Sequence, residues 1–239
     1  MFFNTLHDQP IEIYLVGGAV RDKFIGRCRK DTDYAVEAPS YGMMREYLAT
    51  LGEIILEKPE FFTIKVRIGR QVNDYVLCRR DGMYKDGRHP ESVELGSIYD
   101  DLARRDFTIN AMAISTSTGQ LIDPHDGIQD MRKGILRCVG DPYTRFSEDA
   151  LRILRAIRFK ITLGFVFDPR LSTCFLNPIL LKLLQNVNQD RIREELTKCF
   201  MHDTPATLDI LAQFKLVQNA CFSNSAMWLK PTTEGKERD

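Results

Sequence analysis

One segment, residues 15–36 with the sequence LVGGAVRDKFIGRCRKDTDYAV, constrains this chain more than any other. Its first apolar run ends at Gly17-Gly18, and its second is preceded by Asp31 and Asp33. Residues two apart on an extended strand point to the same side, so the two carboxylates would lie together. The glycine turn beside them would let backbone N–H groups approach a phosphate closely. Because Mg²⁺ prefers such oxygen ligands together with substrate phosphates, the segment predicts metal-assisted phosphoryl or nucleotidyl transfer. An ordinary turn with two solvent-facing aspartates is the alternative.

Composition is typical of a globular protein. The 239 residues are 44% hydrophobic and 28% charged with no net charge, enough for one large domain or two small ones. No apolar stretch reaches the ~20 residues of a membrane span, and the amino terminus lacks the basic and apolar regions of a signal peptide, so we expect neither. The six cysteines form no CxxC pair, which favours free thiols in the cytoplasm over a zinc site or a disulfide framework.

Alternating and apolar runs in the first half of the chain predict a sheet with helices. The expected strands are residues 11–16, 32–36, 54–56, 63–68 and 72–78, and the expected helices are 19–25 and 41–51. The last two strands would form a hairpin across Gly69-Arg70-Gln71. Asp74 is a candidate third carboxylate at the same sheet edge as Asp31 and Asp33, with a solvent-facing strand residue as the equal alternative.

Two segments that follow are harder to interpret. Arg79–Glu91 is rich in glycine and charge and lacks apolar periodicity, so we predict a loop. The apolar spacing of Leu102–Ile114 is compatible with a buried helix that carries Arg104, Arg105 and Asp106 at its start. An aspartate at that place would, without other information, be a simple helix cap.

From Ser147 the character of the chain changes, and beyond Pro169 the pattern is helical only. Ser147–Ala150 opens a helix that ends near Gly164, and further helices are expected over residues 180–184, 190–200 and 206–214. In the first of these helices Arg152, Arg155 and Arg158 recur every three residues, so their guanidiniums would form a stripe able to grip a triphosphate. A solvated basic face is the alternative. The switch from strands to helices predicts a second, helical domain.

Four segments resemble, in order, the motifs of one enzyme family. They are LVGGAVRD with KDTD (15–22 and 30–33), RRDFTINAMA (104–113), DPHDGIQDM (123–131) and EDALRILRAIRF (148–159), with DRIREEL (190–196) as a weaker fifth. The chain resembles the class II tRNA nucleotidyltransferases, or CCA-adding enzymes, and the bacterial poly(A) polymerases. The resemblance implies an α+β fold, with a polymerase-β-like nucleotidyltransferase head (a mixed sheet with flanking helices) over 1–140 and an all-α neck-like domain over 141–229. Residues 230–239 lack apolar side chains and are expected to form a disordered tail.

The resemblance also implies the roles of the site residues. Asp31 and Asp33 would hold catalytic Mg²⁺, with Asp74 as a candidate third ligand, and the attacking group would be the 3′-hydroxyl of an RNA end. The residues matched to nucleotide binding are Gly17, Gly18, Arg21, Arg105, Asp106, Asn110, Asp149, Arg152, Arg155 and Arg158. Among them, Asp106 and Asn110 would recognise the ribose, and Asp149 with Arg152 would read the pairing edge of the base.

The sequence thus leads to three functional hypotheses. The first is an RNA 3′-terminal nucleotidyltransferase that uses CTP and ATP to add or repair the tRNA CCA end. The second is a poly(A)- or oligo(A)-adding polymerase that uses ATP, but IGRCRKDTDY does not show the basic-aromatic signature of bacterial poly(A) polymerases. The third is a non-catalytic nucleotide- or RNA-binding module. Arg79–Glu91 matches in place the family's flexible loop, which is linked to the switch from C to A addition. Family members usually continue into helical body and tail domains that grip tRNA, and this chain stops soon after the neck-like helices.

Overall fold

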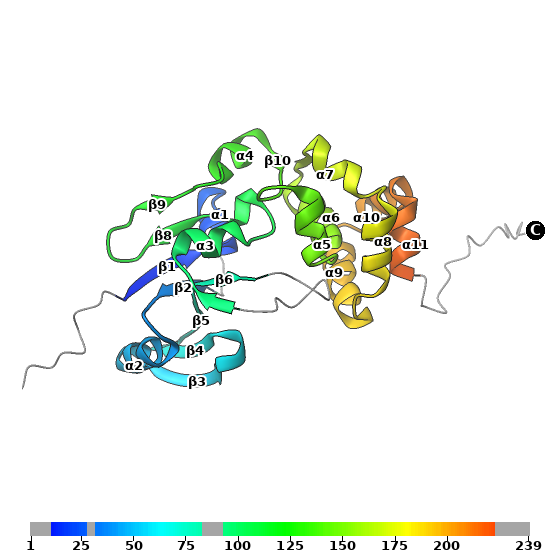
Figure 1. Ribbon diagram of the computed structural model, residues 1–239. Helices are drawn as coiled ribbons and strands as arrows, with labels where there is room; N and C mark the ends of the chain where they lie inside the picture. Colours follow the sequence, from blue (N-terminus) through cyan, green and yellow to red (C-terminus); the bar gives the residue numbers. More distant parts are fainter. Residues whose placement is uncertain (1–10, 28–31, 83–92, 223–239) are drawn as a thin grey trace, which may run out of the picture.

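A mixed seven-stranded sheet forms the first half of the structure (Figure 1). The structure is a computed structural model that describes residues 11–27, 32–82 and 93–222. The described strands run in the order β3-β4-β5-β2-β1-β8-β9; β2 and β5 pair in parallel and the other neighbours antiparallel. Their bounds are β1 (Glu12–Val16), β2 (Asp33–Glu37), β3 (Glu53–Lys58), β4 (Thr63–Ile68), β5 (Gln71–Leu77), β8 (Ala113–Ser115) and β9 (Leu121–Ile122). The five predicted strands and the β4–β5 hairpin are confirmed, and β3 is longer than expected.

Short helices accompany this sheet, and together they make the part that we call the head. The helices are α1 (Gly18–Phe24), α2 (Tyr41–Leu51), α3 (Ile98–Ala103) and α4 (Gly127–Lys133), with 3₁₀ turns at Pro59–Phe61 and Thr108–Asn110. α2 has the predicted bounds because the Ser40 side chain caps its start and Gly52 ends it. A Cβ at Gly52 would lie 2.2 Å from the Arg67 carbonyl oxygen, so α2 meets β4 through a residue without a side chain.

The helix predicted over Leu102–Ile114 is wrong, because this segment holds the end of α3, a 3₁₀ turn and the start of β8. The Asp106 carboxylate accepts hydrogen bonds from the next backbone N–H and from the Asn110 side chain, which closes a local turn that competes with helix. The real helix starts earlier, at a capping box formed by Ser97 and Asp100.

The loop predicted over Arg79–Glu91 is wrong at its start. Residues 79–81 form β6 (Arg79–Asp81), which pairs antiparallel with β7 (Val93–Leu95), and residues 83–91 lie outside the described residues. Pairing depends on Gly96, where a Cβ would lie 2.8 Å from the Arg79 carbonyl carbon. Two short strands so far apart in sequence give no periodic signal of their own.

Helices α5–α11 form the second half of the described chain, which we call the neck. They are α5 (Pro142–Glu148), α6 (Arg152–Leu163), α7 (Pro169–Cys174), α8 (Pro178–Gln185), α9 (Gln189–His202), α10 (Thr204–Gln213) and α11 (Lys215–Phe222). Four of them follow an Asp or Asn cap and carry proline in the first turn, which fixes where they begin. A single strand, β11 (Val166–Phe167), pairs with β10 (Ile135–Leu136) before α5. The predicted α+β class, a mixed sheet with flanking helices followed by helices, is confirmed.

The helix predicted from Ser147 is two helices. α5 ends at Glu148 and α6 begins at Arg152, because Asp149 between them has an extended backbone and its carboxylate accepts from the Leu151 N–H. α6 ends at Gly164, with φ 72°, as predicted. The break leaves Asp149 outside regular helix at the point where head and neck meet.

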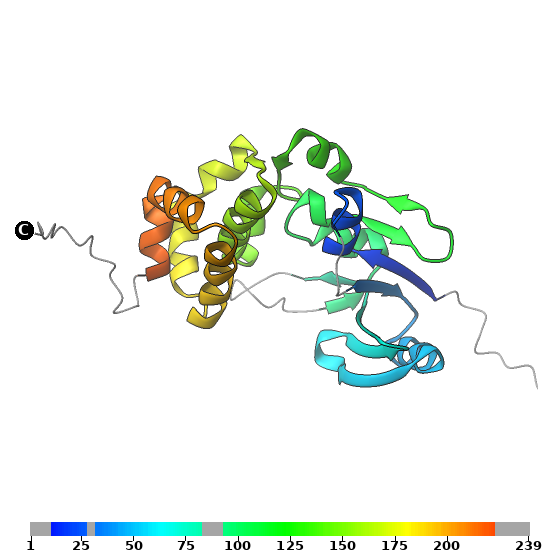
Figure 2. The same cartoon turned by 180° about the vertical axis from the view of Figure 1, so that it is seen from behind.

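One hydrophobic core extends from the neck into the head. It includes the head residues Phe107, Ile109, Leu136 and Cys138, and the Phe107 ring meets the Phe159 ring edge-on at 5.6 Å. Figures 1 and 2 show the neck helices packed beside the head, with α2 and β3 on the head's far side. The domain boundary predicted after residue 140 falls between β10 and α5 and stays a prediction.

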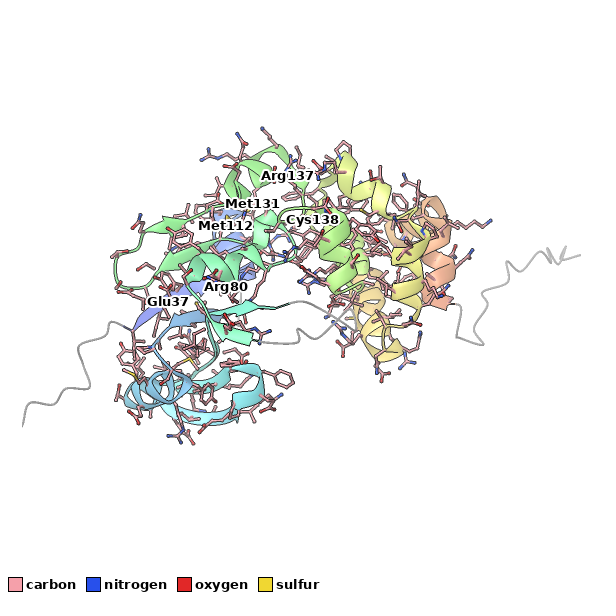
Figure 3. All side chains as sticks on the ribbon, in the orientation of Figure 1. Glu37, Arg80, Met112, Met131, Arg137 and Cys138 are labelled. Atoms are coloured by element: carbon pink, nitrogen blue, oxygen red, sulfur yellow. The ribbon has the colours of Figure 1, made fainter. Side chains whose placement is uncertain are left out.

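Arg137 spans the same junction. Its guanidinium pairs with Asp130 of α4 at 3.1 Å and with Asp168, the cap of α7, at 2.6 Å. Figure 3 labels Arg137 and Cys138 where the head gives way to the neck. Among the helices of the described residues, none has the length and apolarity needed to cross a membrane.

Candidate active site

A pocket of about 550 Å³ lies between head and neck. The head contributes the β1–α1 turn, the start of β2 and the segment after α3, and the neck contributes Asp149, α6 and Arg191 of α9. Its described lining holds four aspartates and seven arginines: Asp33, Asp101, Asp106, Asp149, Arg21, Arg104, Arg105, Arg152, Arg155, Arg158 and Arg191. This excess of positive charge, in a cavity of the size usual for small ligands, suits a polyphosphate.

The pocket brings together most of the predicted site residues. Those that line it are Gly17, Gly18, Arg21, Asp33, Arg105, Asp106, Asn110, Asp149, Arg152, Arg155 and Arg158. Asp31 lies outside the described residues, and Asp74 is not part of the lining. Three motifs that are far apart in sequence therefore share one cavity.

Gly17 joins β1 to α1 in a conformation that only glycine adopts readily. Its φ of 66° and ψ of −132° lie outside the regions open to L-residues. A Cβ at this position would also lie 2.8 Å from Nη1 of Arg105. The missing side chain therefore allows the Arg105 guanidinium to pack directly against the turn.

Gly17→Ala should lower the free energy of unfolding by about 2 kcal/mol and weaken nucleotide binding, because the backbone is strained and Arg105 must move. Thermal unfolding and titration with CTP measure the two effects. Gly42→Ala in α2 is the matched control, since the nearest atom to its new Cβ, the Ser40 hydroxyl, is 3.8 Å away. A Gly17→Ala protein as stable as wild type would contradict the strain.

Asp33 opens β2 and contributes a half-buried carboxylate to the head side of the pocket. It is the register partner of Asp74 on the parallel strand β5, so both side chains leave the same face of the sheet. Asp74 also forms an ion pair with Lys65 at 3.2 Å. The described residues hold no group of three or more His, Cys, Asp or Glu side chains that could bind a metal, and Asp31 lies beyond them.

A buried polar network connects α1 to the neck through Asp106. Arg21 donates to the Asn110 side-chain oxygen at 2.7 Å, the Asn110 amide donates to Asp106 at 3.1 Å, and Asp106 accepts from Nε of Arg155 at 2.8 Å. Burial alone would raise the pKa of Asp106, but the charge of Arg155 and the hydrogen bonds lower it to about 2. Asp106 is therefore ionised and fixes residues from three motifs relative to one another.

Each arginine of the predicted α6 stripe has a carboxylate partner. Arg152 pairs with Glu148 at 2.6 Å, Arg155 with Asp106, and Arg158 with Glu195 at 2.6 Å. Their side chains are only 13%, 33% and 17% exposed, so the alternative of a solvated basic face is wrong. A guanidinium has five N–H groups, and these pairs orient it while using only some of them.

Asp149 and Arg152, the predicted base readers, are oriented separately. Asp149 accepts from Arg191 of α9 at 2.8 Å and from the Leu151 N–H, whereas Arg152 donates to Glu148. An acceptor and a donor thus line the same side of the pocket, and each is held by its own partners. That arrangement can present two different hydrogen-bonding groups to one base edge.

Sequence reasoning assigned no role to eight residues of the described lining: Val16, Tyr34, Val76, Asp101, Arg104, Leu151, Phe159 and Arg191. Asp101 binds two arginines that follow it by three and four residues, a helical spacing that could have revealed it. The Phe159 ring carries guanidiniums at 4.3 to 5.7 Å from its centroid, those of Arg21, Arg155 and Arg158. Arg191 belongs to the DRIREEL segment, which carried no assigned role.

Similarity to known proteins agrees with this geometry. The profile of the poly A polymerase head domain matches residues 13–137. The CCA-adding enzyme of Oceanobacillus iheyensis is 39% identical over 198 residues, covering 82% of this chain and 48% of that protein. The CCA-adding enzyme of Lactiplantibacillus plantarum is 36% identical over 202 residues, with coverages of 84% and 48%. The chain spans about half the length of the curated relatives it matches.

Two solved structures share the fold across head and neck. The CCA-adding enzyme of Bacillus stearothermophilus in complex with CTP superposes with a TM-score of 0.74 at 32% identity, covering 88% of this chain and 50% of that one. A tRNA nucleotidyltransferase complexed with a primer tRNA and an incoming ATP analog gives a TM-score of 0.75 at 31% identity, with coverages of 91% and 61%. With more than half of its residues matched by the profile, the chain belongs to the poly A polymerase head domain family.

Proposed function

We propose that this chain carries the head and neck of an RNA 3′-terminal nucleotidyltransferase, which uses CTP and ATP to add or repair the CCA end of tRNA. One observation carries the proposal: Asp33 of the head lines the same cationic pocket as the neck residues Asp149, Arg152, Arg155 and Arg158. Similarity to enzymes solved with CTP, and with a primer tRNA and an ATP analog, supports the choice of substrates.

Nucleotidyltransferases of this family are metal-dependent, and we propose Mg²⁺ as the ion that this chain uses. Asp33 and Asp31 would hold it, with Asp74 beside them. The residues fit the ion, because the register of β2 and β5 sets two carboxylates on one sheet face, and carboxylate oxygens are ligands that Mg²⁺ prefers. Bound Mg²⁺ supplies activation of the RNA 3′-hydroxyl and neutralises charge on the departing pyrophosphate.

The chain's own residues bind and orient the nucleotide. We assign the phosphates to Gly17, Gly18, Arg21, Arg105, Arg155 and Arg158, which surround the pocket with N–H donors. Asp106 and Asn110 recognise the ribose from the network that joins them. Asp149 as acceptor and Arg152 as donor read the base, so that the protein takes the place of a nucleic-acid template.

Extension of a tRNA that lacks its CCA end tests the proposal directly. The chain is incubated with Mg²⁺ and CTP, ATP or both, and the products are sized. Addition of two residues with CTP alone, and of one more when ATP is included, is the expected result. Absence of extension by the chain would count against it, and the CCA-adding enzyme of a relative serves as the positive control.

Asp149→Ala should reduce the preference for CTP and ATP over UTP and GTP by about 10-fold or more, because a base-reading acceptor is lost. The ratio of kcat/KM values for the four nucleotides measures this preference. Asp190→Ala is the control, since Asp190 pairs with Arg193 on the exposed start of α9, with its side chain 78% exposed. Unchanged discrimination in Asp149→Ala would remove the template role.

Addition of A residues alone is the second candidate function, favoured by the match of residues 13–137 to the poly A polymerase head domain. In the same assay it would give runs of A from ATP on tRNA and on unrelated RNA.

We further propose a cytoplasmic location, supported by free, buried thiols at every cysteine of the described residues: Cys78, Cys138, Cys174, Cys199 and Cys221.

A further inference from the structure

One buried carboxylate, that of Asp101 on α3, holds two of the pocket arginines. Its side chain is 2% exposed. Oδ1 accepts from Nε and Nη2 of Arg104, and Oδ2 accepts from Nε of Arg105 at 3.1 Å and from Nη2 at 2.7 Å. Each carboxylate oxygen thus receives two N–H groups from one guanidinium, in charge-assisted hydrogen bonds that are about twice as strong as neutral ones.

These bonds decide where the Arg105 guanidinium lies. Besides the two bonds to Asp101, Nη1 of Arg105 donates to the Asn110 carbonyl oxygen at 3.3 Å and packs against Gly17. Three of its five N–H groups are used in this way, and the side chain, 22% exposed, lines the pocket. Arg104 is placed beside it by the other carboxylate oxygen. Two like charges are therefore held together by one negative charge between them.

The helix that carries Asp101 is anchored by other groups. Its first N–H, that of Ile98, donates to Glu37 at 2.7 Å, and Asp100 pairs with Arg80 at 3.1 Å. Figure 3 labels Glu37 and Arg80 on the head, where these contacts lie. The Ser97–Asp100 capping box closes the first turn. The Asp101 carboxylate is thus directed to the arginines and is not needed to cap or start α3.

Burial alone would raise the pKa of Asp101, but the charges of Arg105 and Arg104 lower it below the usual range. The carboxylate is therefore charged over the whole physiological pH range. An amide of the same shape offers one acceptor oxygen and one NH₂ group. With asparagine at this position, one of the two guanidiniums would face a donor in place of an acceptor.

We propose that Asp101 is a positioning residue for the incoming nucleotide, holding Arg104 and Arg105 side by side so that they meet its triphosphate. This inference rests on the proposed function of the pocket. Asp101 itself touches no substrate and acts through the two arginines. Its loss would therefore weaken the binding of CTP and ATP alike and leave the choice between them unchanged.

Asp101→Asn tests the proposal, with Asp100→Asn as the matched control on the same helix turn. Titration with CTP and with ATP, steady-state kinetics and thermal unfolding are measured for both variants. We expect Asp101→Asn to raise Kd and KM for both nucleotides about 10-fold or more, with a smaller change in kcat and an unchanged KM for RNA. Asp100→Asn should lower the melting temperature but leave the nucleotide Kd near the wild-type value.

A double mutant separates positioning from a merely structural role. If Asp101 acts through the arginines, Asp101→Asn should add little to the weakened binding of Arg104→Ala/Arg105→Ala. Full additivity, or an unchanged Kd in Asp101→Asn, would overturn the proposal. Because binding is measured without RNA, a wild-type chain that binds CTP yet extends no tRNA would contradict the proposed function alone.

Discussion

Asp33→Asn should lower kcat for nucleotide addition by at least about 1,000-fold while the melting temperature stays close to that of wild type. The loss follows from removing the charge of a proposed metal ligand, which would be worth several kcal/mol of transition-state stabilisation. The fold should persist because Asp33 is half-buried at the first residue of β2 and asparagine keeps its shape. Single-turnover extension of a tRNA lacking its CCA end, together with thermal unfolding, measures both quantities.

Two further variants sharpen this result. Glu53→Gln removes an acid of the same sheet whose side chain is 67% exposed, and it should leave kcat unchanged. In Asp74→Asn, a loss as large as that of Asp33→Asn would make Asp74 a third ligand, whereas a loss below about 10-fold would leave it as the partner of Lys65. Asp33→Asn with more than a tenth of wild-type kcat would exclude Asp33 from the metal site.

Asp106→Asn should lower the free energy of unfolding by about 3 kcal/mol, because it leaves the Arg155 guanidinium without its charged partner at the junction of head and neck. A loss of that size corresponds to a melting temperature about 10 °C lower in a chain of this length. Urea unfolding followed by circular dichroism measures it. Asp190→Asn removes an exposed ion pair and should stay within about 0.5 kcal/mol of wild type.

The Asp106–Arg155 ion pair also predicts how the difference in the free energy of unfolding between wild type and Asp106→Asn depends on pH. The pKa of Asp106 is about 2 in the folded chain and 3.8 for the free side chain, so the carboxylate stabilises the fold fully above about pH 5. This stabilisation is lost as the pH falls from about 4 towards 2, because the unfolded chain takes up the proton first. The stability gap between wild type and Asp106→Asn should therefore narrow between pH 6 and pH 3. A constant gap would show that the charge of Asp106 contributes nothing.

Elements with local signals could be predicted from the sequence, and elements that depend on distant contacts could not. α2 has a serine cap at one end and a glycine at the other, so both of its bounds were correct. Leu102–Ile114 has helical apolar spacing, yet the hydrogen bonds of Asp106 bend it into a turn. The strand at residues 79–81 was missed because its partner, β7, follows a long interval.

The site shows the same division. The glycine turn, Asp33 and the α6 arginines could be inferred because residue spacing and the order of motifs are visible in the sequence. Their partners could not, since Glu195 reaches Arg158 across 37 positions and the Phe159 ring meets Arg21 only where neck and head touch. The role of Asp101 could have been inferred from its spacing of three and four residues to Arg104 and Arg105. It was missed because the predicted helix began at Leu102, whereas α3 begins at Ile98.

The core shared by head and neck has a consequence for how the chain is made. Phe107 of the head leaves the ribosome before Phe159 of the neck, whose ring packs edge-on against it. Domains generally fold as units during synthesis, but this head remains without part of its interior until α6 has emerged. α6 supplies both the Phe159 ring that covers Phe107 and the Arg152, Arg155 and Arg158 side chains of the pocket, so a chain that ends before α6 lacks this part of the core and these pocket arginines.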